Sequence, residues 1–231
     1  MSFDSLGLRA ELLAAVSTEG YTTPTPIQSK TIPLILEGRD VLAGAQTGTG
    51  KTAAFTLPML QLLSSSGQGE RGRAPRALVL APTRELAAQV HESIRTYGRN
   101  LRQSSTVVFG GVGINPQIDA LRRGVDILVA TPGRLLDHAG QGTVNLSKVE
   151  ILVLDEADRM LDMGFVQAVK TIAAATPTSR QTLLFSATLE GQVLEVARRL
   201  LKDPARIQLA ASTDRHAGIV QHVHQADDAT H

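Results

Sequence analysis

The sequence contains no cysteine and no tryptophan, and only 3% of its 231 residues are aromatic. The absence of cysteine excludes disulfides, thiol nucleophiles and cysteine-ligated zinc sites. No apolar run approaches the ~20 residues that a membrane-spanning helix needs. The first residues, MSFDSLGLRAELL, include an early acid and lack the apolar segment of a signal peptide. We therefore expect no membrane partner and a reducing location, the cytoplasm.

The chain also lacks an excess of charge of either sign. It has 23 Lys and Arg against 22 Asp and Glu, which gives a formal net charge of +1. Any contact with nucleic acid must therefore come from a local group of residues and not from the field of the whole molecule. Hydrophobic residues make up 42% of the chain, which suits a globular domain with a sizeable core.

Seven short segments rich in Val, Ile and Leu recur along the chain, and amphipathic segments with helical spacing lie between them. The apolar residues run continuously, which is typical of strands buried on both faces in a parallel sheet. The predicted strands span residues 40–45, 77–82, 105–111, 126–131, 150–156, 181–188 and 205–209, and the predicted helices span 51–63, 84–99, 114–123, 164–175 and 189–201. We predict an α/β fold with a doubly wound parallel sheet, helices on both faces, and ligands at the carboxyl ends of the strands.

Two segments carry no such pattern. Residues 64–75, SSSGQGERGRAP, predict a polar surface loop. The tail of residues 211–231 indicates the end of the domain near residue 210. Three histidines lie in that tail, but two of them at positions i and i+2 without a nearby third ligand are more typical of a surface than of a metal site; they are His222, His224 and His231.

The segment AGAQTGTGKTAAF, residues 43–55, follows a predicted strand and leads into a predicted helix. It fits the phosphate-binding pattern G-x-x-x-x-G-K-[ST], with Ala45 in place of the first glycine. Glycines let the backbone approach an anion, and the amides and the helix N-terminus attract it. We expect Lys51 to contact the β- and γ-phosphates and Thr52 to ligate Mg²⁺. An ordinary loop with an exposed lysine is the less favoured alternative. The remaining loop residues are Gln46, Thr47, Gly48, Thr49 and Gly50.

The segment ILVLDEAD, residues 151–158, places acids directly after a buried strand. Asp155 is positioned to hold Mg²⁺, and Glu156 to orient or deprotonate an attacking water. The alternative is an acidic helix start, because Asp and Glu favour first turns. Together with residues 45–52, the acids predict hydrolysis of a nucleoside triphosphate, with Lys51, Asp155 and Glu156 as the catalytic residues.

Five further motifs stand in order around these two: GYTTPTPIQ (20–28), PTRELA (82–87), GG (110–111), TPGR (131–134) and SAT (186–188). With them the chain resembles the DEAD-box ATP-dependent RNA helicases over nearly its whole length. MSFDSLGL, PTPIQ and LDEADRMLDMGF resemble the bacterial RhlE type. The resemblance implies the RecA-like fold of P-loop NTPases for residues 1–210, with a Q-motif region at 1–29. The family's second RecA-like domain has no counterpart in these residues, so we expect little activity from the chain alone.

The resemblance also implies roles for single residues. Gln28 would read the adenine of ATP, because a carboxamide can pair with N6 and N7 of that base. Tyr21 and Phe3 could flank the base, although core packing is nearly as favoured for Phe3. Asp158 would couple nucleotide state to RNA binding through Ser186 and Thr188, which their chemistry alone would make local caps.

RNA would be contacted through its backbone and 2′-OH groups, with little sequence preference. The resemblance implies that a glycine pair and two helix starts make these contacts. A turn and simple helix caps would explain the same residues without RNA. The residues are Thr83, Arg84, Gly110, Gly111, Thr131, Gly133 and Arg134. In particular, Thr131 is expected to cap a helix that has Pro132 in its first turn.

The resemblance implies ATP and Mg²⁺ as cofactors, and RNA and the second RecA-like domain as partners. Ribosome assembly or RNA decay is the pathway suggested by the RhlE type. Two other functions stay open: a non-enzymatic adapter gated by nucleotide, and a different P-loop enzyme such as a kinase or DNA translocase. Gln28 and the long gap between Lys51 and Asp155 disfavour a small kinase.

Overall fold

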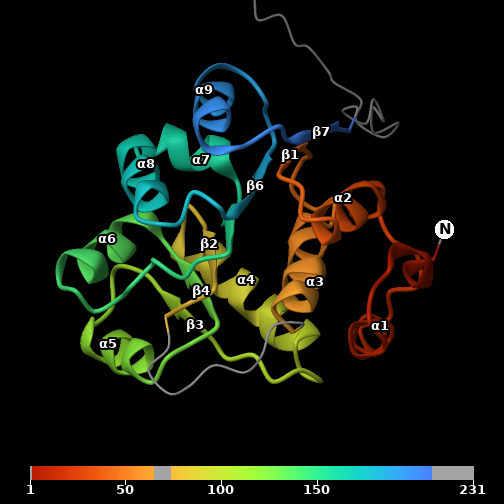
Figure 1. The fold of residues 1–231 in the computed structure, drawn as a ribbon, viewed down its shortest axis with the longest axis horizontal. Helices are drawn as coiled ribbons and strands as arrows, with labels where there is room; N and C mark the ends of the chain where they lie inside the picture. Colours follow the sequence, from red (N-terminus) through yellow and green to blue (C-terminus); the bar gives the residue numbers. More distant parts are fainter. Residues whose placement is uncertain (1, 65–73, 210–231) are drawn as a thin grey trace, which may run out of the picture.

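The computed structural model describes residues 2–64 and 74–209, and its centre is a parallel sheet with the strand order β3-β4-β2-β5-β6-β1-β7 (Figure 1). Every strand pairing is parallel. The strands are β1 (Val41–Gly44), β2 (Ala77–Leu80), β3 (Ser105–Val108), β4 (Ile127–Ala130), β5 (Ile151–Leu154), β6 (Gln181–Ser186) and β7 (Ala205–Gln208). Each lies within a predicted strand, so the α/β sheet is confirmed.

The two faces of the sheet are covered by different halves of the chain. Alternate strand residues point to opposite faces, so Val153 packs with the N-terminal helices and Leu152 with the C-terminal ones. In Figure 1, α1 to α3 lie to the right of the sheet, and α5, α6, α8 and α9 lie to the left. The helices are α1 (Ala10–Thr18), α2 (Pro26–Leu36), α3 (Lys51–Ser64), α4 (Arg84–Tyr97), α5 (Asn115–Arg122), α6 (Pro132–Gly140), α7 (Ala157–Asp162), α8 (Val166–Ala174) and α9 (Gly191–Leu200).

The five helices predicted from spacing are confirmed as α3, α4, α5, α8 and α9. The list of predicted helices omitted α1, α2, α6 and α7, although a helix capped by Thr131 was expected, and a 3-10 turn over Phe3–Leu6 precedes α1. Phe3 belongs to the buried core. The expectation that it flanks a base is therefore wrong, and core packing is its role. Most of the predicted loop and the whole tail from residue 211, with its three histidines, lie outside the described residues.

Among the described residues, no helix is long and apolar enough to cross a membrane.

The buried carboxylate of Asp40 fastens three elements at the amino end of the sheet. It lies just before β1, where Oδ1 accepts the amide of Thr182 on β6 at 2.8 Å. Its Oδ2 accepts the amide of Lys202, between α9 and β7, at 2.7 Å. Hydrogen bonds to a buried charge are stronger than neutral ones, so Asp40 fixes β1 between its two neighbours.

We predict that Asp40→Ala lowers the free energy of unfolding by about 2–4 kcal/mol, because two amides lose an ionised acceptor. Urea denaturation measures the change. Asp162→Ala is the control, since Asp162 is exposed and no described hydrogen bond uses its carboxylate. Equal stabilities for the two variants would contradict the role of Asp40.

Candidate functional site

Apart from Tyr21 and Gln28, which precede β1, the predicted site residues follow the carboxyl ends of strands, and the strand order divides them into two groups. The phosphate loop follows β1, the acids follow β5, and the SAT residues end β6; these three strands are neighbours. The residues expected to bind RNA follow β2, β3 and β4, which are neighbours in the other half of the sheet. One edge of the sheet thus carries two neighbouring sets of residues. We call those expected to bind nucleotide the nucleotide group and those expected to bind RNA the RNA group.

The phosphate loop leaves its backbone amides without partners. Ala45 is still tied to the sheet, since its amide donates to the carbonyl of Ser186 at 2.9 Å. Beyond it, no hydrogen bond of the described chain uses an amide of residues 46–52 as donor. Gly48 and Gly50 have φ of +82° and +91°, a region that favours glycine. Successive unpaired amides at the start of a helix form an anion-binding concavity.

The side chain of Lys51 is buried beneath this loop. The residue is 6% exposed, and its Nζ has no hydrogen-bond partner in the described chain. Asp155 at the end of β5 is 2% exposed. Burial raises the pKa of Asp155 to about 6, while the positive charge of Lys51 opposes that rise and the charge of Glu156 adds to it. The Nζ of Lys51 thus makes no hydrogen bond to the carboxylate of Asp155 among the described residues, an arrangement common where a further charged group binds.

Glu156 adopts a strained backbone conformation next to this pair. Its φ of 49° and ψ of 54° lie in the left-handed region, which is costly for a residue with a Cβ. Its amide donates to Oδ1 of Asp155 at 3.0 Å. Its carboxylate lies 3.4 Å from the guanidinium of Arg159. This left-handed conformation changes the direction of the chain between β5 and α7, so that Asp155 and Glu156 have different surroundings.

Asp158 joins the ends of β5 and β6, as the resemblance implied. Its amide donates to Oγ of Ser186 at 3.2 Å. Its Oδ2 accepts the amides of Ala187 and Thr188, both at 3.1 Å, and the hydroxyl of Thr188 at 3.3 Å. Ser186 and Thr188 are therefore not local caps. Since the carbonyl of Ser186 also holds Ala45, this one residue connects the phosphate loop with the acidic motif.

Gln28 lies against the phosphate loop, where both ends of its carboxamide are engaged. It forms a capping box with Thr25 at the start of α2, in which Oε1 accepts the Thr25 amide at 3.0 Å. Its Nε2 donates to the carbonyl of Gly50 at 3.2 Å. One N–H and one lone pair remain for a ligand. Sequence reasoning missed this support of the loop, although the T-x-x-Q spacing of a capping box was readable. Tyr21 is 56% exposed.

In the RNA group, the loop after β3 also presents unpaired amides. No described hydrogen bond uses an amide of residues 110–113 as donor. Gly111 has a φ of +81°, and a Cβ there would lie 3.4 Å from Nη1 of Arg84. Arg84 itself is exposed and paired with Glu85 at 2.6 Å. Thr83 caps α4 by accepting the amide of Leu86 at 3.2 Å.

The TPGR segment corrects one expectation. Thr131 occupies the N-cap position of α6, but its side chain makes no capping hydrogen bond, so the predicted side-chain cap is wrong. Its hydroxyl-bearing side chain is packed at a buried position. Arg134 points inward, with a side chain 11% exposed, and its Nη2 donates to the carbonyl of Val112 at 3.0 Å. Gly133 is exposed at the first turn of the helix.

A sequence model described as DEAD/DEAH box helicase matches residues 25–196. The chain belongs to this family. It is 48% identical over 221 residues to the ATP-dependent RNA helicase DeaD of Escherichia coli, covering 95% of this chain and 34% of that protein. It is 44% identical to the ATP-dependent RNA helicase CshA of Limosilactobacillus reuteri, covering 91% of this chain and 41% of that protein. The chain therefore spans less than half the length of these relatives. Neither bears the RhlE name, so that subtype stays a prediction.

Two solved structures are similar along most of the chain. A DEAD box protein from the hyperthermophile Methanococcus jannaschii has a TM-score of 0.84 and 40% identity, over 90% of this chain and 56% of that one. A hypothetical ATP-dependent RNA helicase from Sulfolobus tokodaii has a TM-score of 0.79 and 39% identity, over 87% and 57%. These likenesses confirm the RecA-like sheet of the helicase family.

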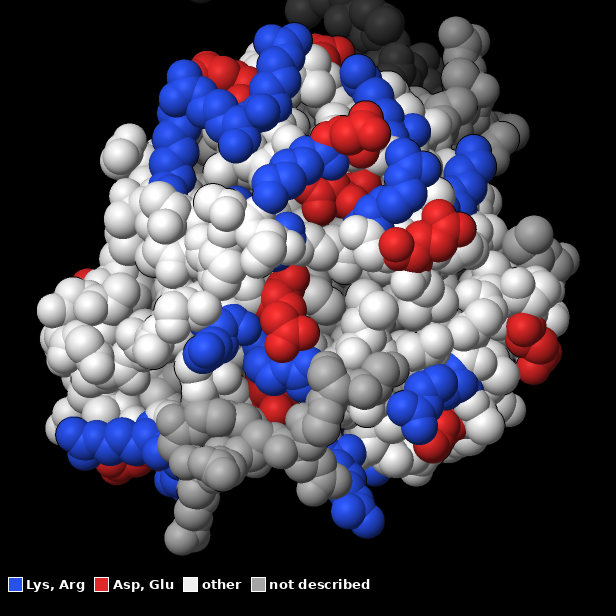
Figure 2. Space-filling model, in the orientation of Figure 1, with Lys and Arg blue, Asp and Glu red and all other residues white. Residues whose placement is uncertain are grey.

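Charge on this helicase domain is interspersed. In the face shown in Figure 2, Lys and Arg side chains are most numerous in the upper part, and Asp and Glu side chains lie among them. This agrees with the net charge of +1.

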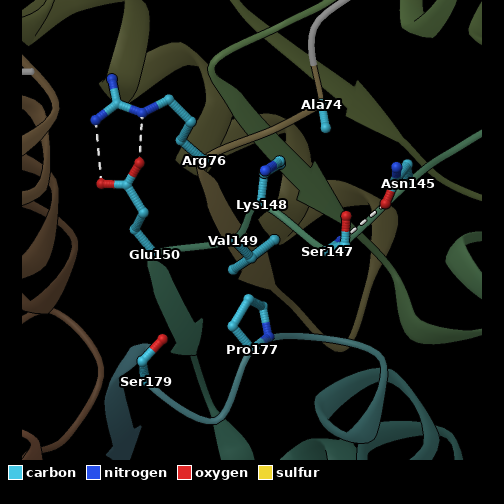
Figure 3. A pocket seen from close by; sticks show the side chains of 9 residues that line it. All are labelled: Ala74, Arg76, Asn145, Ser147, Lys148, Val149, Glu150, Pro177 and Ser179. Carbon is cyan, nitrogen blue, oxygen red and sulfur yellow. Dashed lines mark hydrogen bonds and ion pairs between the residues drawn. The ribbon is translucent and has the colours of Figure 1, made fainter.

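A cavity of about 610 Å³ lies at the opposite edge of the helicase sheet and contains none of the predicted site residues (Figure 3). Arg76 and Glu150 form a two-point ion pair on its wall, at 2.7 and 3.1 Å. Asn145 accepts the amide of Ser147 at 2.9 Å. Because none of the predicted site residues lines this cavity, we keep the carboxyl edge as the candidate site.

We predict that Asp155→Asn stabilises the nucleotide-free domain by on the order of 2 kcal/mol at pH 8. In the unaltered domain the folded state disfavours the ionised carboxylate of Asp155. The resulting destabilisation is fully present at pH values above its pKa of about 6. It should shrink as the pH falls through 6 towards the ordinary value of 3.8. Thermal unfolding at a series of pH values measures it, with Asp162→Asn as the control. A lower melting temperature for Asp155→Asn at pH 8 would show that the charge is favoured by the fold.

Proposed function

We propose that this chain is the N-terminal, nucleotide-binding RecA-like domain of an ATP-dependent RNA helicase. The observation that carries the proposal is the buried ammonium group of Lys51, which has no hydrogen-bond acceptor beside a loop of unpaired amides. A buried charge without such a partner is costly. A triphosphate supplies acceptors for the ammonium group and for the amides of residues 46–52 at the same time.

The residues present fit a magnesium-bound triphosphate. Thr52 and Asp155 would hold Mg²⁺, which supplies neutralisation of phosphate charge when bound. The hydroxyl of Thr52 has no described protein partner, and the carboxylate of Asp155 is buried next to Lys51. Glu156, held in its own strained conformation, would orient the attacking water and accept its proton.

Selection of ATP is assigned to Gln28 and Tyr21. The remaining N–H and lone pair of Gln28 are the complement of adenine N6 and N7. Since the same side chain donates to Gly50, contact with the base would be transmitted to the phosphate loop. Tyr21 is exposed and offers an aromatic face for the base.

RNA binding is assigned to the neighbouring half of the edge. The unpaired amides of residues 110–113, the exposed first turn of α6 at Gly133 and the exposed guanidinium of Arg84 would contact phosphates. Such contacts carry little sequence information, so the RNA would be bound through its backbone. Asp158 follows β5, the strand of the nucleotide half that borders β2, and its contacts with the end of β6 would couple the two halves.

The whole protein would close a second RecA-like domain over ATP and RNA. An arginine from that domain would stabilise the transition state, a contribution worth about 10³–10⁵ in rate in related NTPases. This chain alone would then hydrolyse ATP slowly. A cytoplasmic location and a role in ribosome assembly or RNA decay stay predictions from the resemblance.

We predict that Gly50→Ala weakens binding of a fluorescent ATP analogue at least about tenfold. A Cβ at this position would lie 2.6 Å from Nε2 of Gln28 and 3.0 Å from the Thr25 hydroxyl, which would displace the loop. Gly38→Ala is the matched control, because Gly38 also has a positive φ but nothing lies within 4 Å of a Cβ there. Similar affinities for both variants would argue against the loop as the nucleotide site.

We predict that Glu156→Gln, made in the whole protein, lowers RNA-stimulated ATP hydrolysis by about 10² or more and leaves ATP binding intact. The carboxamide keeps the size of the side chain but cannot accept a proton. Exposed Glu37 supplies the control variant, Glu37→Gln. Steady-state ATPase assays with and without RNA measure the effect. An adapter would show no RNA-stimulated hydrolysis in the unaltered protein, which would overturn the proposed function.

A further inference from the structure

A buried glutamine on α5 holds the inner side of the loop formed by residues 109–113. Nε2 of Gln117 donates to the carbonyl of Phe109 at 3.0 Å and lies 3.5 Å from the carbonyl of Gly113. Carbonyl oxygens only accept hydrogen bonds, so the amide nitrogen of Gln117 must face the loop. Its Oε1 consequently faces the opposite way, towards α6.

A fully buried histidine on α6 meets that oxygen. Nε2 of His138 lies 3.3 Å from Oε1 of Gln117, and its Nδ1 lies 2.8 Å from the hydroxyl of Thr143. Because Oε1 only accepts, Nε2 carries the hydrogen, and Nδ1 of the neutral ring accepts from the Thr143 hydroxyl at 2.8 Å, so the single hydrogen of that hydroxyl is not donated to the carbonyl of His138 at 3.1 Å. Burial and the nearby charge of Arg134 lower the pKa of His138, against the effect of Asp137, which agrees with a neutral ring.

Three carbonyls of this loop therefore have hydrogen-bond partners inside the domain, whereas its amides have none among the described residues. Gln117 binds the carbonyls of Phe109 and Gly113, and Arg134 binds the carbonyl of Val112 at 3.0 Å. The amides of residues 110–113 have no described acceptor. A carbonyl turned towards an anion would repel it, whereas an amide attracts it. Holding these three carbonyls on the inner side thus helps to keep the amides available to a phosphate.

We propose that Gln117 and His138 are positioning residues for RNA binding, in that His138 orients the amide of Gln117 and Gln117 fixes the loop of residues 109–113. The proposal rests on the proposed function of this loop as a phosphate contact. It gives two residues outside the family's motifs a role in RNA affinity, although neither is expected to touch RNA.

A purely structural role is the competing explanation, since the amide of Thr143 also donates to the carbonyl of His138 at 2.9 Å near the C-terminal end of α6. Two substitutions of His138 separate the explanations. In His138→Gln the amide nitrogen can reach the place of Nε2, so the bond to Gln117 is kept. In His138→Asn the shorter amide reaches only the place of Nδ1, so the contact with Thr143 is kept and the one with Gln117 is lost.

The experiment measures binding of a single-stranded oligoribonucleotide to the whole protein by fluorescence anisotropy, with a non-hydrolysable ATP analogue present. We expect His138→Asn to weaken RNA binding about tenfold and His138→Gln to stay within about twofold of the unaltered protein. The affinity for the ATP analogue should be unchanged in both. The salt dependence should keep its slope, because lost amide contacts release no counterions, whereas Arg84→Ala should reduce the slope by about 1.

A second variant keeps the inference testable if His138 variants fold poorly. Gln117→Glu retains an acceptor towards His138 but turns a carboxylate oxygen towards the loop carbonyls, and it should also weaken RNA binding selectively. Equal RNA affinity of His138→Asn and His138→Gln, or unchanged affinity of Gln117→Glu, would overturn the positioning role alone. An unaltered protein that binds the ATP analogue but no RNA would overturn the proposed RNA contact as well.

Discussion

The buried ammonium group of Lys51, facing Asp155 without an acceptor in the described chain, is the constraint on which the rest of the site depends. A buried cation is stabilised by a nearby anion, but burial raises the pKa of Asp155 to about 6 and so disfavours its charged form. The loop of unpaired amides before Lys51 has the same requirement. The buried ammonium group and the unpaired amides therefore lack a polyanion, which a triphosphate would supply.

The order of the strands connects the phosphate loop with the acidic motif and the end of β6. β5 and β6 lie side by side, so Asp158 can bind both Ser186 and Thr188. Ser186 in turn holds the first residue of the phosphate loop through its carbonyl. A shift of the loop on nucleotide binding would thus reach the acids and the end of β6 directly. The loops after β2, β3 and β4 lie next along the same edge, where RNA is proposed to bind.

Much of the fold could be predicted because its signals are local. Continuous Val, Ile and Leu marked each strand, and glycine with lysine before a helix marked the phosphate loop. The six residues of α7 are too few to show a helical period, and Glu156 before it has a left-handed backbone that no propensity favours. The exposure of Tyr21 and the burial of Phe3 depend on which residues pack against them.

The sequence by itself determined the parallel sheet, the edge that carries the candidate site, and the identity of the residues that are proposed to contact phosphates. Those features follow from hydrophobic pattern and from chemistry within a few residues of chain. Only the tertiary structure decided that Gln28 supports Gly50, that Arg134 turns inward to Val112, and that Gln117 meets His138. These contacts join elements up to 22 residues apart, and side-chain direction across such a gap is set by packing, not by local sequence.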